Sequence, residues 1–259
     1  MGRVDLIKKH VESIKWIRDE LIEFDETIPP IMGVGDWDDA VCLDFSGRLL
    51  ASSDGPYAKR LVMKSALIHA STDILAKGGR PLFALDCAAG PIEDVREMID
   101  SIRIQGRHMK IPVLGGNTRI EDCSPSMSIT VLGELIIEEP IRDSGARKGD
   151  ILCLVGEPLW GGRGERIEKA KRMFDCWLEA IQSIQVDCAK DVTKGGLVAT
   201  VHEIGEKSGR TMRLEQDPPY PVSRNLDNIL AAVSEPEVDR LEGICLSHHV
   251  SFNRIGVVE

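Results

Sequence analysis

The sequence has few aromatic residues and no long apolar run. Phe, Trp and Tyr make up 4% of its 259 residues, and no segment approaches the roughly 18 uninterrupted apolar residues of a membrane-spanning helix. The opening residues, MGRVDLIKKHVES, lack the apolar region of a signal peptide. We therefore expect a cytoplasmic protein without a membrane partner.

Paired cysteines and concentrated positive charge are also lacking. The seven cysteines form no C-x-x-C pair, which argues against a disulfide framework and a zinc knuckle and favours reduced thiols. The net charge of −10 argues against a protein that binds the backbone of nucleic acids. An acidic protein can still bind a nucleotide, normally through magnesium.

The pattern of apolar residues predicts strands and helices that alternate, in two halves separated near residues 140–148. The hydrophobic content of 42% and the length suffice for two domains. This order is typical of an α/β protein. The expected helices are residues 3–23, 64–77, 92–109, 165–184, 197–207 and 235–246, and the expected strands are 40–44, 49–53, 81–88, 111–118, 127–137, 151–155, 229–233 and 252–258.

A single carboxylate, Asp73, interrupts the small, apolar helix within KSALIHASTDILAKGGRP. It falls in the last two turns, where the helix dipole disfavours a negative charge. One interpretation is a solvated side chain, or one that pairs with Lys64, Lys77 or Arg80. The other is a ligand for a metal or a phosphate-bound cation, which requires further carboxylates from elsewhere in the chain.

Such carboxylates flank the predicted hairpin of residues 40–53. Asp36, Asp38 and Asp39 precede it and Asp54 follows it, so the hairpin brings at least two of them to one end of a small sheet. Crowded carboxylates repel one another, and a divalent cation relieves that repulsion.

Glycine pairs mark two further places of interest. Gly115 and Gly116, followed by Asn117 and Thr118, allow either a close approach of the backbone or a tight turn. The glycine-rich EPLWGGRGER lacks the G-x-x-x-x-G-K-[ST] pattern of a phosphate loop, so by itself it is weak support for a nucleotide site.

In AKDVTKGGLVATVHEIGEKSG, the second glycine pair, Gly195 and Gly196, follows Asp191 and Thr193 and starts a helix. Free amides at a helix start favour an anion, whereas an N-cap by Asp191 or Thr193 would explain the same residues. His202 is expected to face solvent or to pack within the helix, because no cysteine or histidine lies at metal-ligand spacing.

Four separated motifs give the chain a family resemblance: GDWDDAV with SSDG, STDILAKGGRPL, PVLGGNTR, and GARKGD followed by DVTKGGLVATVHEIGEKSG. The chain resembles the aminoimidazole ribonucleotide synthetase (PurM-like) superfamily, which includes thiamine-monophosphate kinase, selenophosphate synthetase and the hydrogenase maturation carbamoyl dehydratase. It is most similar to the synthetase-related, or methanogenesis marker, proteins of archaea.

The resemblance implies an α/β (α+β) protein of two domains. Residues 1–142 would form a PurM-like N-terminal domain with a mixed sheet and helices that binds ATP and magnesium. Residues 143–259 would form a PurM-like C-terminal α/β domain, shortened around 216–228. Two copies would form a homodimer through their N-terminal domains.

The resemblance also assigns site residues. Asp36, Asp54 and Asp73 would bind magnesium, with the register among Asp36, Asp38 and Asp39 left open because Trp37 interrupts the usual acidic pair. Asp191 and Thr193 would be catalytic, with Asp191 as a metal ligand or a base. The cofactor-binding residues would be Asp36, Asp54, Gly55, Asp73, Gly115, Gly116, Asn117, Thr118, Gly195 and Gly196.

The expected function is that of an ATP- and magnesium-dependent enzyme, similar to a kinase or synthetase, that phosphorylates an oxygen of a small-molecule substrate. Two departures from the family favour an alternative, a catalytically inactive ATP-binding regulatory or assembly protein. Asn117 replaces the aspartate of the GGDT motif in the kinases and hydrogenase maturation members, and residues 216–228 look short, as if a helix were missing. The substrate is not specified by the sequence.

Overall fold

The structure is a computed structural model that describes residues 16, 19–29, 34–35, 45–192 and 194–259. The chain divides into two compact units. Unit 1 comprises Met1–Ala70 and Pro81–Gly133, and unit 2 comprises Ser71–Arg80 and Glu134–Glu259. The predicted strand 40–44 lies outside the described residues, and so does most of the predicted helix 3–23. The described part of that region ends in a short 3-10 helix, η1 (Ile22–Glu26).

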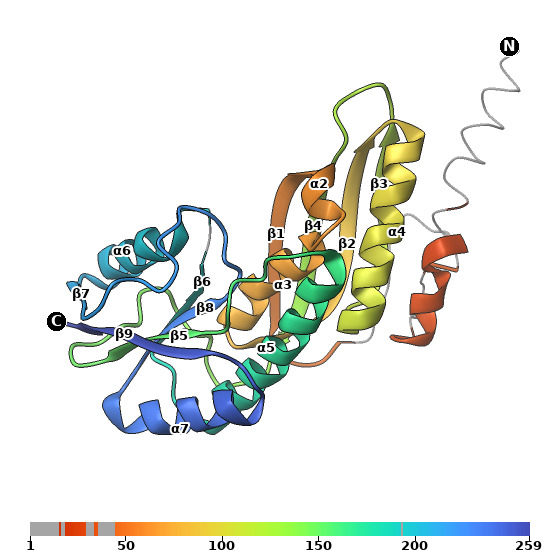
Figure 1. Ribbon diagram of the computed structural model, residues 1–259. Helices are drawn as coiled ribbons and strands as arrows, with labels where there is room; N and C mark the ends of the chain where they lie inside the picture. The colour runs from red at the N-terminus through yellow and green to blue at the C-terminus, as the bar shows by residue number, and fades with distance from the viewer. Residues whose placement is uncertain (1–15, 17–18, 30–33, 36–44, 193) are drawn as a thin grey trace, which may run out of the picture. The chain divides into compact units, whose positions relative to one another are not determined.

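The sheet of unit 1 has four described strands in the order β1-β4-β2-β3 (Figure 1). Strands β2 and β3 run parallel, and α4 connects them, as a parallel pair requires a crossover connection. The ends of α3, β2 and β4 are shared with unit 2. The bounds are β1 (Leu49–Ala58), α2 (Lys59–Val62), α3 (Ala66–Ala76), β2 (Gly79–Gly90), α4 (Ile92–Met109), β3 (Val113–Ile120) and β4 (Ser126–Leu135).

The helices of unit 1 cover one face of this sheet because the apolar residues recur at matching periods. In α4, the side chains of Val95, Met98, Ile99 and Ile102 are buried, which is the spacing of one helix face. In β4, Met127, Ile129 and Val131 alternate with more exposed residues, which is the period of a half-buried strand. The two patterns together form the core of this unit.

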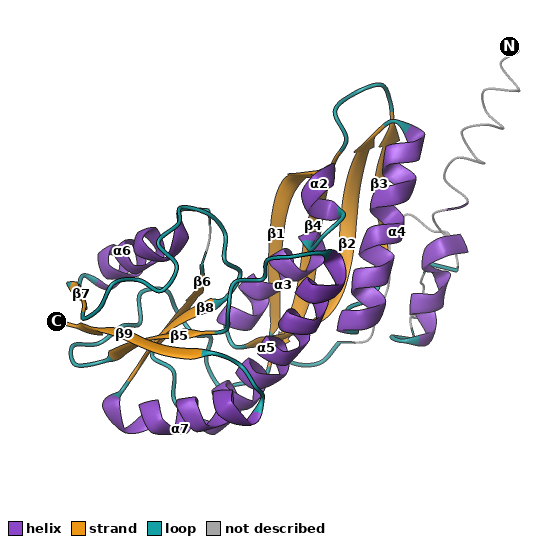
Figure 2. Ribbon diagram, viewed as in Figure 1, coloured by secondary structure: helices purple, strands orange, loops and turns teal. Residues whose placement is uncertain are grey.

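The sheet of unit 2 has five strands in the order β6-β8-β5-β9-β7, and the neighbouring strands are antiparallel. Helices lie on both of its faces (Figure 2), which explains why every residue of β5 is buried. The bounds are β5 (Ile151–Val155), α5 (Arg163–Ser183), β6 (Cys188–Asp191), α6 (Gly196–Ser208), β7 (Met212–Leu214), β8 (Ile229–Val233), α7 (Glu235–Ser247) and β9 (Phe252–Val258).

The structure confirms the predicted α/β class with a mixed sheet and differs in its details. The predictions missed α2, β6 and β7, which have three or four residues each and are too short to show a period. Residues 215–228 contain neither helix nor strand, in line with the short segment seen in the sequence. Within the described ranges, no helix is long and apolar enough to cross a membrane.

Candidate functional site

In unit 1, Asp54 near the end of β1 is held by two neighbours. Its Oδ1 accepts a hydrogen bond from the backbone N–H of Gly55 at 2.7 Å, and its Oδ2 lies 3.4 Å from Nε2 of His69 in α3. The His69 ring meets the ring of Tyr57 edge-on, with centroids 5.5 Å apart. The Asp54 side chain is 38% exposed whereas that of His69 is 8% exposed. The buried His69 therefore orients the Asp54 carboxylate, and the exposed part of that carboxylate can still bind a ligand.

The first glycine pair lies within a strand, so the tight-turn interpretation is wrong. Strand β3 continues past Gly115 and Gly116 to Ile120, and Gly116 stands in register with Asp86 of β2. A Cβ on Gly116 would lie 2.0 Å from the backbone oxygen of Asp86 and 2.8 Å from its Oδ1. The glycine is therefore needed for a close approach of β2. Gly116 and the following Asn117 are exposed and form a polar edge.

Asp86, a residue not predicted from the sequence, lies against Gly116 at this edge. The residue is 6% exposed, and its Oδ2 is buried with no hydrogen-bond partner in the described part of the chain. Burial raises the pKa of Asp86 to about 7, although a hydrogen bond from its own backbone N–H opposes the shift. The signal in the sequence is a lone aspartate in the predicted buried strand 81–88.

Asp73 lies in α3 and is half-buried. Two of its basic neighbours have other acidic partners, because Lys77 pairs with Asp143 and Arg80 with Glu134. The pairing of Asp73 with Lys64, Lys77 or Arg80 stays a prediction. Asp73 belongs to unit 2, whereas Asp54 belongs to unit 1.

The donor set for magnesium is only partly described. Asp36, Asp38 and Asp39 lie outside the described residues, and among the residues that are described no three His, Cys, Asp or Glu side chains form a group that could hold a metal ion. Magnesium bound with a nucleotide takes one or two carboxylates and completes its shell with phosphate oxygens and water. The partly exposed carboxylate of Asp54 could supply one such oxygen ligand.

In unit 2, Asp191 ends β6 and is 3% exposed. The N-cap residue of α6 is Gly195, which has no side chain that could cap the helix, so the interpretation of Asp191 as the N-cap residue is wrong. Thr193 lies outside the described residues. Gly196 has a φ of +78°, and a Cβ there would lie 2.1 Å from the backbone oxygen of Val222. The start of α6 is therefore packed directly against the segment before β8.

Backbone hydrogen bonds bring three segments of unit 2 together: 156–162, 191–192 and 220–228. The N–H of Leu159 donates to the oxygen of Leu226 at 2.9 Å, and the N–H of Leu226 donates to the oxygen of Val192 at 3.1 Å. The guanidinium group of Arg224 stacks over the ring of Trp160 at 5.1 Å. Local sequence patterns do not predict these contacts, because they join residues that are far apart in the chain.

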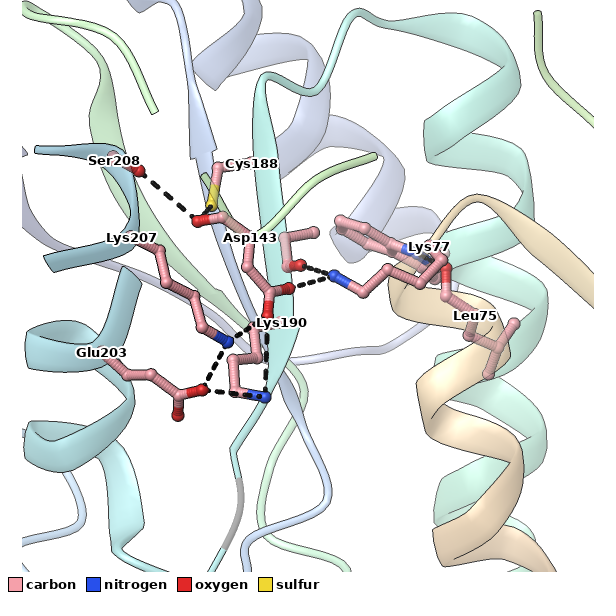
Figure 3. Close-up of polar contacts among 10 residues, drawn as sticks. Leu75, Lys77, Asp143, Cys188, Lys190, Glu203, Lys207 and Ser208 are labelled. Atoms are coloured by element: carbon pink, nitrogen blue, oxygen red, sulfur yellow. Dashed lines mark hydrogen bonds and ion pairs between the residues drawn. The ribbon is translucent and has the colours of Figure 1, made fainter. Parts of the chain in front are cut away.

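A charged cluster fixes β6 just before Asp191 (Figure 3). Asp143 pairs with Lys77, with Lys207 at 2.7 Å and with Lys190 at 3.9 Å, and Lys77 also donates to the backbone oxygen of Ala189 at 2.6 Å. Burial alone would raise the pKa of Asp143, but the three lysines outweigh it and hold the pKa below its ordinary value. Through Ala189 and Lys190, the cluster ties β6 to other segments of unit 2.

The paired α/β units, each with helices packed on its own sheet, define a two-domain protein with the PurM-like fold. Thiamine-monophosphate kinase from Stenotrophomonas maltophilia superposes with a TM-score of 0.72 at 18% identity, over 95% of this chain and 92% of that one. The hydrogenase maturation protein HypE in complex with ATP superposes with a TM-score of 0.70 at 16% identity, over 91% and 83%. At these identities the likeness shows the fold alone.

The chain belongs to the AIR synthase-related protein family. Residues 37–135 match the N-terminal domain of this family and residues 161–259 match its C-terminal domain. An uncharacterized protein of Methanocaldococcus jannaschii is 34% identical over 255 residues, which cover 95% of this chain and 85% of that protein. Other curated relatives are longer: the chain spans 49% of a selenide, water dikinase and 25% of a PurL subunit.

Proposed function

We propose that the protein is an ATP- and magnesium-dependent enzyme that phosphorylates an oxygen of a small molecule. The observation that carries the proposal is the match of both halves of the chain to the two domains of one family. The proteins similar to this chain include a kinase, a dikinase and a protein with a structure in complex with ATP. The finer assignment to this chain is our inference from that family and from the site residues.

In unit 1, the proposed nucleotide site consists of Asp54 and Gly55 on β1 and the glycine edge of Gly115, Gly116, Asn117 and Thr118 on β3. Bound magnesium would neutralise charge on the phosphates. Asp54, oriented by His69, would contribute one oxygen ligand, and Asp36 is a second proposed ligand. Asp73, which belongs to unit 2, remains a separate proposed magnesium ligand. The exposed glycine edge would let the nucleotide approach the backbone closely.

In unit 2, Asp191 and Thr193 are the proposed catalytic residues, and the amides near Gly195 and Gly196 would bind the acceptor or the transferred phosphoryl group. Transfer of a phosphoryl group needs little covalent help from the protein, so alignment and charge stabilisation suffice. The near-complete burial of Asp191 at the end of β6 supports a fixed position. A base acts from within roughly 3 Å of its proton.

The proposal predicts that Asp54→Asn weakens binding of ATP in the presence of magnesium by at least about tenfold, because a carboxylate oxygen is lost from the metal shell. Isothermal titration calorimetry measures this affinity. Asp122→Asn, a change at an exposed acid of the same unit, is the matched control. Equal affinity in the Asp54 variant and the control would remove Asp54 from the site. Failure of the wild-type protein to bind ATP would defeat the proposed function.

A second candidate, a regulatory or assembly protein that binds ATP without turnover, is favoured by two observations. Asn117 is an exposed, uncharged side chain on the glycine edge, and residues 215–228 lack a helix. Incubation with ATP, magnesium and a mixture of metabolites distinguishes the two functions. Phosphoryl transfer or hydrolysis supports the enzyme, whereas tight binding without either supports the regulatory protein.

We propose a homodimer that joins N-terminal domains, because β1 is an edge strand of the described sheet and carries an exposed Leu49. A division of the chain after residue 142 and a cytoplasmic location are further proposals. Neither nucleic acid nor a membrane is proposed as a partner.

A further inference from the structure

The buried carboxyl group of Asp86 lowers the stability of unit 1. Its Oδ2 is buried without a hydrogen-bond partner among the described residues. Burying such a polar atom costs stability, and native proteins rarely retain one without a use for it. Asp150, a comparably buried aspartate of unit 2, shows the ordinary solution, because its Oδ2 accepts a hydrogen bond from the backbone N–H of Arg147 at 2.8 Å.

The carboxyl group of Asp86 lies next to an exposed edge of the sheet, where a ligand could reach it. The carboxyl group occupies the space that a side chain at position 116 would take, since a Cβ there would lie 2.8 Å from Oδ1. Gly116 itself is exposed, and so are the neighbouring side chains of Asn117 and Cys87, which stand in register on the two strands. The buried acid thus adjoins an open, polar edge rather than the centre of the core.

We infer that Asp86 is a ligand-binding residue of unit 1 whose Oδ2 accepts a hydrogen bond from an O–H group of bound nucleotide. The inference rests on the proposed function, because it places the nucleotide along the glycine edge. The donor is either a ribose hydroxyl or a water bound to magnesium, since both present an O–H to a carboxylate. A bound donor would satisfy Oδ2, for which the described residues offer no hydrogen-bond partner.

A purely structural role for Asp86 predicts the opposite behaviour on mutation. An acid that stabilises the fold lowers stability when it is replaced. An acid kept for binding at a cost to the fold leaves stability equal or higher when it is replaced, while binding is lost. Asparagine has nearly the same shape as aspartate, so Asp86→Asn separates these two cases without leaving a cavity.

The test compares the wild-type protein, Asp86→Asn and the control Asp150→Asn at pH 8. Calorimetry measures the affinity for ATP with magnesium and for ATP with EDTA, and thermal denaturation without ligand measures stability. We expect Asp86→Asn to bind ATP with magnesium at least about tenfold more weakly, with a melting temperature equal to or above that of the wild type. Asp150→Asn should keep the wild-type affinity.

Each outcome decides one question. A loss of affinity with both forms of ATP identifies the ribose hydroxyl as the donor, and a loss with magnesium alone identifies the metal-bound water. Unchanged affinity in Asp86→Asn overturns the inference, and so does a loss of affinity that accompanies a lower melting temperature. Failure of the wild-type protein to bind ATP at all would reject the proposed function, and the inference with it.

Discussion

At the scale of single residues, Asp86 should make the stability of the protein depend on pH. Burial raises its pKa from an ordinary value of 3.8 to about 7, so between these values the folded protein holds a proton that the unfolded chain has released. The stabilising effect of that proton is complete below about pH 4 and is lost as the pH rises through about 7.

The measurement is urea denaturation of the wild type and Asp86→Asn between pH 4.5 and pH 8. The free energy of unfolding of the wild type should fall relative to the variant as the pH rises, by at most about 4 kcal/mol. The other titrating groups are common to both proteins and cancel in the difference. A difference that stays constant over this range would show that Asp86 has an ordinary pKa.

Residue types in the sequence were enough to propose Asp54, because an acid at the end of a predicted strand suggests a ligand. They were not enough to find its neighbour His69, which comes from α3, or Asp86, whose importance depends on the register between β2 and β3. Contacts between residues distant in sequence depend on how strands pair, and no local pattern contains that pairing.

At the scale of elements, the path from β6 to α6 carries the predicted chemistry of unit 2. Asp191→Asn should lower turnover by roughly 100-fold or more, because a base or metal ligand would be lost, while affinity for ATP and the melting temperature change little. Steady-state kinetics and thermal denaturation measure these effects, once a substrate has been found. The control is Asp187→Asn, at the other end of β6, where the acid pairs with Arg147 at 3.1 Å.

Wild-type turnover in Asp191→Asn would leave this residue with a structural role at the end of its strand. A fall in turnover in the control as well would indicate that both changes disturb β6 itself rather than a catalytic group.

The elements themselves could be predicted wherever their pattern was long or wholly apolar. The predicted bounds of α4, β5, β8 and β9 agree with the structure to the residue. Short elements such as β6 were missed, since their place is fixed by partners far along the chain, including the Asp143 cluster. The N-cap interpretation of Asp191 failed for a related reason, because the chain takes four more residues to reach Gly195.

At the scale of the whole molecule, the proposed homodimer predicts an effect at β1, the edge strand of the sheet as far as it is described. Leu49→Lys places a charge on that edge, where charges hinder pairing between strands, and should shift the protein toward the monomer. Light scattering coupled to size-exclusion chromatography measures the mass. Leu246→Lys in α7 is the control, since Leu246 is 66% exposed and Leu49 is 48% exposed. A wild-type monomer would contradict the proposal.

Dimerisation also bears on the interpretation of affinity. A partner subunit that binds only the folded protein raises its apparent stability by mass action. If the dimer forms through unit 1, dilution should therefore lower the melting temperature of the wild type but not that of a monomeric Leu49 variant. Affinities for ATP should therefore be compared at one protein concentration.

Trp177 of α5 is fully buried, and its Nε1 donates a hydrogen bond to the backbone oxygen of Leu75 at 2.8 Å, within unit 2. The chain thus carries a native fluorophore whose emission should lie at short wavelength while α5 stays packed on the end of α3. Replacing the chain's other three tryptophans, Trp16, Trp37 and Trp160, with phenylalanine would make the emission report on unit 2 alone. Its opening could then be followed without an attached dye.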